Sequence, residues 1–392
     1  MESPTFRAYN FRMDETPLPS AETLNVGQRI RRARERLGLT QLEVSEASGI
    51  GNSSLSEIEN GKREPAISQL KKLELVLHVT IAELLSPIEQ PSPQVRWRMR
   101  PEGREATEAE AKFLQRCRQY FHLEHWAGEE RPIQLPRSET YPESYVAVER
   151  FAKSVSNTLT LGDRPGLLLR KKLEDDCALK LFHAPIEPSG TAACTWHAEF
   201  GPAVLLNARN SPARRTFDLA HELYHLLTWD FDAPDKEVDE KFADCFASAL
   251  LLPDDAVRDA LERRLKGNEI STANLCELAR DFHVSIDAFL WRVHRIYRWN
   301  EDQTREVIEK ARRVMPPYRD VTADRDESAP ELPERYRTLA IQALRSGEIS
   351  TGRFAEYLGL RRSEAMKYAE QVGDDEAISL PPVSWPASHD AL

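Results

Sequence analysis

Two histidines four residues apart, with a glutamate directly after the first, are the residues of this chain whose types and spacing point most clearly to chemistry. They are His221, Glu222 and His225. On a helix, residues four apart lie on one face, so both imidazoles can reach a single metal ion. Glu222 lies beside them and can take a proton from a water that the metal activates. This His-Glu-x-x-His pattern predicts a catalytic zinc site.

A catalytic zinc site needs a third protein ligand and leaves its fourth position to water. The sequence predicts a second strong helix over residues 239–252, ended by Pro253. Glu240 lies 15 residues after His225, which gives the chain room to turn and pass back across the first helix. We therefore expect the carboxylate of Glu240 to be the third ligand.

Other polar residues near the motif have expected supporting roles. Asp244, one turn after Glu240, is expected to accept a hydrogen bond from a ligand imidazole, and Asp218 is the competing candidate for that role. Zinc lowers the pKa of its water and polarises a carbonyl, so Glu222 is the expected general base. An oxyanion stabiliser is also expected, and the candidates are Tyr224, His197 and Arg215. The alternative is a closed or vestigial zinc site that senses or stabilises without turnover.

The elements that must position these residues follow from the apolar pattern. Short apolar runs at residues 166–170, 178–182 and 203–207, separated by Gly and Pro, predict strands. Because the motif helix follows directly, we expect a small sheet to back the site. Residues 96–128 and 270–298 have helical periodicity. The predicted fold class is mainly α with a small β-sheet, that is, α+β.

Four segments resemble the ImmA/IrrE family of metallopeptidases, and the match covers roughly residues 160–298. They are residues 203–207, 215–225, 240–253 and 278–292. The resemblance implies a zincin-like metallopeptidase domain with His221, His225 and Glu240 as zinc ligands and Glu222 as the base. It also implies cleavage of a DNA-binding repressor in a stress or mobile-element response. Tyr224 stands where the family more often has Gly, and we expect its bulky side chain to narrow the cleft.

A second motif lies far upstream. Residues 40–49 and 54–63, followed by Pro65, resemble the XRE (Cro/CI repressor-like) helix-turn-helix, so we expect a five-helix, lambda-repressor-like unit. Apolar residues can pack its second and third helices together, while the start of the third helix stays polar. The residues expected to contact DNA are Gln41, Asn52, Ser53, Ser54, Ser56, Glu57, Lys62 and Arg63. Further candidates for backbone contacts are Arg29, Arg31, Arg32 and Arg34.

The charge balance of this unit weakens the electrostatic case for DNA binding. Acids nearly match bases between residues 27 and 87, so a helical adaptor with solvated charges is the alternative. The net charge of the whole chain is −11, so any DNA binding must be local to one face. A homodimer on a palindromic double-stranded operator is the expected mode of binding.

Length and composition limit the number of domains and the class of protein. The 392 residues predict two to four domains of a soluble globular protein. Five scattered cysteines without CxxC spacing are expected to be reduced buried thiols. No apolar run approaches a membrane span, and the N-terminus lacks a signal-peptide pattern, so the expected location is cytoplasmic.

The expected domain organisation combines these motifs. We expect a flexible N-terminus over 1–24, the helix-turn-helix domain over 25–87, a linker and connecting helix over 88–135, the metallopeptidase domain over 136–300, a linker over 301–333, a helical C-terminal unit over 334–372 and a flexible tail over 373–392. The sequence pattern of residues 332–337 and 349–359 is that of another small helix-turn-helix. An interaction or dimerisation module is favoured there over a second DNA reader.

The function predicted from these features is a DNA-binding transcriptional regulator with zinc-dependent endopeptidase activity that cuts a repressor to relieve repression. Its cofactor is Zn²⁺, with Mn²⁺ as the alternative metal. The alternative function is a non-proteolytic repressor or antitoxin-like regulator whose metal domain is a sensor or binding module. A free-standing housekeeping peptidase leaves the helix-turn-helix unexplained.

Overall fold

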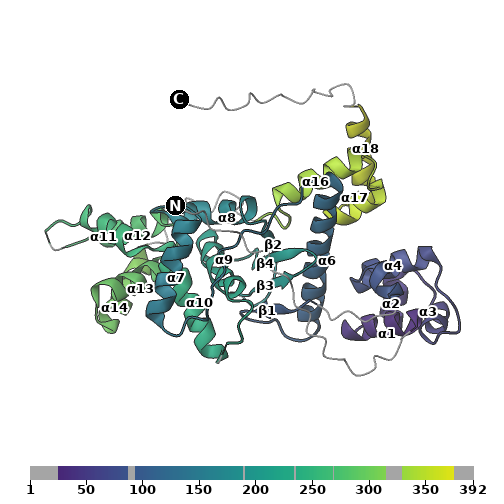
Figure 1. The fold of residues 1–392 in the computed structure, drawn as a ribbon, viewed down its shortest axis with the longest axis horizontal. Helices are drawn as coiled ribbons and strands as arrows, with labels where there is room; N and C mark the ends of the chain where they lie inside the picture. The colour runs from purple at the N-terminus through teal and green to yellow at the C-terminus, as the bar shows by residue number, and fades with distance from the viewer. Residues whose placement is uncertain are drawn as a thin grey trace, which may run out of the picture. The chain divides into compact units, whose positions relative to one another are not determined.

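The computed structural model describes residues 25–86, 93–188, 190–233, 235–267, 269–314 and 329–374. The N-terminus expected to be flexible, most of the expected tail and parts of both expected linkers lie outside these residues. The chain divides between Ser92 and Pro93 into two compact units (Figure 1). No helix of the described ranges combines the length and the apolar character that crossing a bilayer requires.

The N-terminal unit contains five short helices. They are α1 (Val26–Arg36), α2 (Gln41–Ser48), α3 (Asn52–Glu59), α4 (Ile67–Leu77) and α5 (Ile81–Leu85). Asn25 and Thr40 cap α1 and α2 through reciprocal side-chain hydrogen bonds with the third helical residue. Gly49, with a φ of 63°, ends α2 in the left-handed conformation that favours glycine. The predicted helix-turn-helix fold is confirmed.

Gly27 marks the place where α1 and α3 approach most closely. A Cβ atom on Gly27 would lie 1.9 Å from the backbone oxygen of Ile58. We expect Gly27→Ala to lower the melting temperature of the N-terminal unit and to weaken DNA binding, because two backbones must separate, at a cost of about 1–3 kcal/mol or more. Thermal unfolding measures this, with Gly51→Ala as the control, since nothing lies within 4 Å of a Cβ there. Equal melting temperatures for the two variants would contradict the prediction.

The second unit is built around a four-stranded mixed sheet. Its strands are β1 (Val95–Trp97), β2 (Lys180–Ala184), β3 (Ala192–His197) and β4 (Gly201–Asn207), in the order β1-β3-β4-β2. β2 and β4 are parallel, and the other two pairs are antiparallel. Every residue of β4 is buried, because helices cover both faces of the sheet. The predicted mainly helical fold with a small sheet is confirmed.

One predicted strand is wrong, and two observed strands, β1 and β3, were not predicted. Residues 166–170 lie in helix α8 (Pro165–Asp175), not in a strand. Leu169 is fully buried while Leu167 and Leu168 are exposed, so the apolar run presents only one face to the core, as a helix does. The helix predicted over residues 96–128 is wrong at its start, because the observed helix begins at Gly103 and residues 96 and 97 belong to β1. The three residues of β1 carry too little pattern to show a strand.

The two faces of the sheet belong to two separate cores, because side chains alternate along each strand. One face packs with α7 (Tyr145–Thr158), α8, α9 (Pro212–Leu227) and α10 (Lys236–Leu251). The opposite face packs with α6 (Gly103–Ala127), α16 (Glu334–Arg345) and α17 (Thr351–Leu358). The remaining helices are α11 (Asp254–Glu262), α12 (Thr272–Asp281), α13 (Ile286–Tyr297), α14 (Glu301–Val314) and α18 (Arg362–Asp374).

The C-terminal helices do not stand apart from the sheet. α16 packs along α6, and the buried Tyr336 hydroxyl lies 3.0 Å from the side-chain oxygen of Gln119 on α6. Tyr336 also packs edge-to-face against Tyr120 and Phe182, which ties α16 to α6 and to β2. These helices therefore complete the core on the face of the sheet opposite the motif helix.

Candidate metal centre

The motif helix α9 begins where the sequence supplies a cap and a proline. The side chain of Ser211 accepts a hydrogen bond from the backbone N–H of Arg214, and Pro212 occupies the first helical position. From Asp218 to Leu227 every residue is buried, because α9 packs against β3 and β4 and against α10. The helix therefore carries its polar motif inside the protein, where polar atoms without partners are costly.

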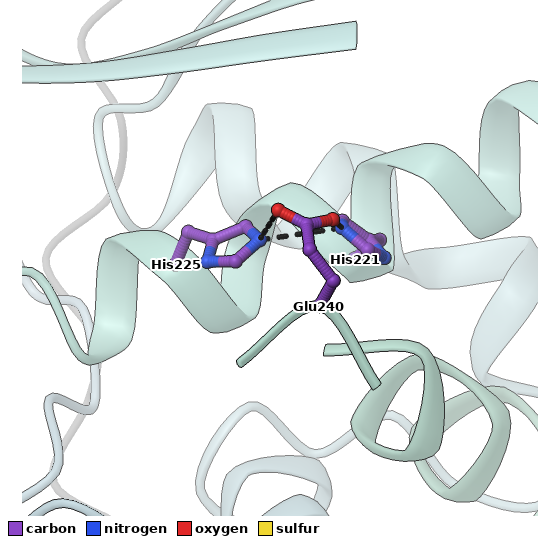
Figure 2. Close-up of side chains that lie close together, drawn as sticks. All are labelled: His221, His225 and Glu240. Carbon is purple, nitrogen blue, oxygen red and sulfur yellow. Dashed lines mark hydrogen bonds and ion pairs between the residues drawn. The ribbon is translucent and has the colours of Figure 1, made fainter. Parts of the chain in front are cut away.

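Three side chains from α9 and α10 converge on one point (Figure 2). Nε2 of His221 lies 3.2 Å from Nε2 of His225 and 3.2 Å from Oε2 of Glu240. Oε1 of Glu240 lies 3.7 Å from Nε2 of His225. Zn²⁺ binds such ligands at about 2.0–2.1 Å, so two of its tetrahedral ligands lie about 3.3 Å apart. The observed spacings are close to those of a zinc ligand set.

The second nitrogen of each imidazole faces a carboxylate. Nδ1 of His221 lies 2.8 Å from Oδ1 of Asp244, and Nδ1 of His225 lies 3.3 Å from Oδ2 of Asp239. In neutral imidazoles, these carboxylates favour the proton on Nδ1 and leave the lone pair on Nε2. Two lone pairs 3.2 Å apart repel each other unless a cation lies between them. The residues present therefore fit a divalent metal.

Glu222, the predicted general base, is fully buried beside the two histidines. Neither carboxylate oxygen forms a hydrogen bond of good geometry with a described residue, and the Cys194 thiol that interacts with it is a weak donor. Burial raises the pKa of Glu222, although both imidazoles oppose the rise. A water at the metal position would supply the donor that this buried carboxylate lacks.

The carboxylates around His221 favour its protonated form. Burial by itself would lower the pKa of His221, but hydrogen bonds to Asp244 and Glu240 outweigh burial and raise that pKa to about 9. The imidazole must lose this proton before it can bind a metal, so protons and metal compete for the site.

We expect the apparent zinc affinity to rise about tenfold per pH unit from pH 7 towards pH 9 and then to level off, because one proton is displaced from His221. Zinc titrations against a competing chelator at several pH values measure this slope. The stability of the metal-free protein should change in the opposite sense. The raised pKa stabilises the fold below pH 6.5, and this contribution is lost as the pH rises through about 9. A zinc affinity independent of pH over this range would contradict the prediction.

A pocket of about 410 Å³ opens beside the three side chains. Its lining includes His225, Asp239 and Glu240 on one side and residues 94–98 of β1 and its flanks on the other. This volume is within the range of ligand-binding pockets. The pocket therefore gives a route by which a segment of another molecule can approach the candidate metal ligands.

Asp218 occupies a different position from Asp244 in the site. Its Oδ1 accepts hydrogen bonds from Arg98 and Arg214, at 2.8 and 2.9 Å, and its Oδ2 accepts one from Asn210 at 2.9 Å. No hydrogen bond joins Asp218 to an imidazole among the described residues, whereas Asp244 has one to His221. Asp218 is thus a buried carboxylate that accepts hydrogen bonds from Arg98, Arg214 and Asn210 and orients no imidazole of the described residues.

The three candidate oxyanion stabilisers do not line the pocket. Tyr224 is fully buried and packs against Phe246, so the expectation that its side chain narrows the cleft is wrong. Arg215 donates to the backbone carbonyls of Ala208 and Asn210, which lie just before α9. His197 stacks on Phe200 at the end of β3. The structure therefore assigns none of the three to the reaction.

Asp239, and the residues that donate to the carboxylates of Asp239 and Asp244, were not predicted from the sequence. Asp239 directly precedes the chosen ligand Glu240, and the hydroxyl of Tyr141 donates to its Oδ1 at 2.8 Å. Arg98 donates to Oδ1 of Asp244 at 2.9 Å. Asp239 was within reach of sequence analysis through its place beside Glu240. Tyr141 and Arg98 come from distant segments that carry no local signal.

In the N-terminal unit, the residues predicted to contact DNA lie on and around α3. Asn52, Ser53, Glu57, Lys62 and Arg63 are exposed, and Gln41, Ser54 and Ser56 are partly buried. The side chain of Gln41 donates to the buried carboxylate of Glu59 at 2.8 Å, and Glu59 also pairs with Arg34 at 2.7 Å. Arg34, expected to face the DNA backbone, is therefore engaged within the unit and stabilises the start of α2.

Comparisons with known proteins agree with the two motifs. Residues 30–84 match the family described as helix-turn-helix, and residues 175–294 match the family described as IrrE N-terminal-like domain, peptidase M78. The HTH-type transcriptional regulator PuuR of Escherichia coli (strain K12) is 42% identical over 77 residues, which are 19% of this chain and 42% of PuuR. The uncharacterized HTH-type transcriptional regulator y4dJ of Sinorhizobium fredii is 38% identical over 65 residues, which are 17% of this chain and 84% of y4dJ.

A third relative is similar over a comparable length. The HTH-type transcriptional regulator ImmR of Bacillus subtilis (strain 168) is 37% identical over 62 residues, which are 16% of this chain and 49% of ImmR. The chain thus spans less than half the length of PuuR and of ImmR. The similarity to these relatives concerns a segment of the size of the N-terminal unit.

Proposed function

The chain belongs to the helix-turn-helix transcriptional regulators and carries an IrrE N-terminal-like peptidase domain, and from this premise we propose that it is a DNA-bound metalloendopeptidase. In this proposal, the N-terminal unit binds an operator, and the second unit cuts a repressor protein to relieve repression. Zn²⁺ is the proposed cofactor, with Mn²⁺ as the alternative.

The observation that carries the proposal is the convergence of His221, His225 and Glu240 beside a buried glutamate without a strong donor. These three residues would hold the metal. When bound, the metal would lower the pKa of a water molecule and polarise the carbonyl of the peptide bond to be cut.

Residues of the chain would transfer the proton, orient the imidazoles and bind the substrate. Glu222 would accept a proton from the attacking water and could pass it to the leaving amine, and burial, which raises its pKa, makes the carboxylate a stronger base. Asp244 holds the imidazole of His221 through a hydrogen bond, and Asp239 lies 3.3 Å from Nδ1 of His225, so both would favour Nε2 as the metal-binding atom. The pocket between β1 and the start of α10 would receive the substrate segment.

The proposed substrate is a DNA-binding repressor, because the chain joins its peptidase domain to an operator-binding unit. A peptidase attached to DNA meets other proteins bound nearby at a high effective concentration. The exposed polar residues at the start of α3 would read base edges in the major groove, and a homodimer would place two such helices on a palindrome. In the same proposal, the C-terminal helices serve interaction or dimerisation.

The test is cleavage of candidate repressors. The full chain, loaded with zinc, is co-expressed with repressors encoded near its gene, and their fragments are identified by mass spectrometry. We expect one defined cut that disappears when His225→Ala replaces the wild type. Identical fragments with both proteins would show that another peptidase makes the cut.

A second candidate function is supported by the burial of the site. His221 is fully buried and His225 is 4% exposed, so the two imidazoles offer little surface to a substrate, although the side chain of Glu240 is 28% exposed. A regulator that senses a metal without cutting would need no more access than this. Operator binding that changes with bound zinc, without any cleaved protein, would favour this candidate.

A further inference from the structure

Residues 95–98 bring an arginine from a distant part of the sequence to the candidate metal centre. β1 pairs with β3, and the backbone N–H of Arg98 continues the ladder by donating to the carbonyl of Ala192. Trp97 is buried in the core on the α6 side of the sheet, while the guanidinium of its neighbour Arg98 donates to Asp218 on α9 and to Asp244 on α10. The alternation of side chains along a strand therefore directs Arg98 towards α9 and α10.

The guanidinium of Arg98 joins two carboxylates from two different helices. Nη1 lies 2.8 Å from Oδ1 of Asp218 on α9, and Nη2 lies 2.9 Å from Oδ1 of Asp244 on α10. The same Oδ1 of Asp244 lies 2.8 Å from Nδ1 of His221. Arg98 thus donates a hydrogen bond to the same carboxylate oxygen that pairs with the imidazole of His221.

Asp244 needs such a support because its side chain is 51% exposed. An exposed carboxylate can turn into water and release the imidazole that it orients. Asp218 is fully buried and is held by Arg214 and Asn210 as well as by Arg98, so it forms a rigid anchor. A guanidinium with two donors in a fixed plane can span both carboxylates, which a single ammonium cannot do equally well.

We propose that Arg98 is a positioning residue of the metal centre, which fixes Asp244 against the buried Asp218 and so holds His221 in its metal-binding orientation. This inference rests on the proposed metal site. It extends the site beyond residues 175–294, which match the peptidase family, to a segment that begins directly after the DNA-binding unit.

The test compares full-length variants by zinc affinity, measured against a chromophoric chelator, and by the visible absorption of bound Co²⁺, which reports ligand geometry. We expect Arg98→Gln to weaken zinc binding at least about tenfold and to change the Co²⁺ spectrum, since outer partners of this kind contribute about 10–100-fold to affinity. Arg98→Lys should recover part of the affinity, because it restores the charge without the two-pronged geometry.

Arg100 provides the matched control. It also lines the pocket, but it is 59% exposed, and its ion pair with Glu110 is 3.4 Å long. Arg100→Gln should bind zinc as the wild type does. Thermal unfolding of the metal-free variants separates loss of fold from loss of positioning, and if Arg98→Gln does not fold, Arg98→Lys carries the test.

The outcomes distinguish the inference from the function on which it rests. Wild-type zinc affinity and an unchanged Co²⁺ spectrum in Arg98→Gln would overturn the role of Arg98 while leaving the metal site in place. A wild-type protein that binds neither zinc nor cobalt would overturn the proposed metal site itself.

Discussion

Under the proposed function, Glu222→Gln is expected to slow cleavage of the repressor substrate by about 10²–10⁴-fold, because general acid–base catalysis contributes about that factor. Gln has nearly the shape of Glu, so the buried position beside Cys194 stays filled, but the amide cannot accept the proton. The measurement is the rate at which the zinc-loaded variant cuts purified repressor under conditions where the wild type cuts it completely.

The same variant should bind zinc and operator DNA as the wild type does. Glu222 is not among the three residues whose ligand atoms converge, and the DNA-binding unit lies elsewhere in the chain. Zinc content and operator affinity are therefore the controls. Undiminished cleavage by Glu222→Gln would show that another group takes the proton. Lost cleavage with unchanged regulation in cells would favour the metal-sensing candidate.

Removal of the metal is expected to lower the melting temperature of the second unit by about 10 °C. A ligand that binds only the folded state stabilises it by about 4 kcal/mol at 1,000 times its dissociation constant, and a domain of this size gains about 2–4 °C per kcal/mol. The stabilisation comes from the ligand group itself. Without a cation, the Nε2 atoms of His221 and His225, 3.2 Å apart, must share a proton or repel each other.

The measurement is thermal unfolding of the full chain with zinc and after treatment with a chelator. His225→Ala is the matched variant, since it removes one ligand and should abolish the dependence on zinc. The transition of the N-terminal unit should stay in place in every sample and serves as an internal reference. An identical melting temperature of the second unit with and without zinc would argue that no structural metal binds there.

The sequence of this protein determined the features that depend on neighbouring residues. His221 and His225 share a helix face because they are four residues apart, and the caps at Asn25 and Thr40 mark helix starts by short-range hydrogen bonds. Glu240 was predicted as the third ligand from its spacing after His225, and the family resemblance implied the same residue. The structure places its carboxylate within 3.7 Å of both Nε2 atoms.

Ambiguity remained where a local pattern fits two structures. The apolar run at residues 166–170 suits a buried strand or one turn of a helix, and packing against the core selected the helix of α8. Three residues of β1 were too few to show a period, and only pairing with β3 makes them a strand.

The tertiary structure alone decided which distant side chains complete the site. Arg98 meets Asp218 and Asp244 across 120 and 146 positions of the chain, and Tyr141 meets Asp239 across 98. Such contacts form only when the sheet and helices pack, because their geometry depends on strand order and helix placement and not on spacing along the chain. Local periodicity therefore identified the candidate metal ligands, while long-range packing determined what holds them in place.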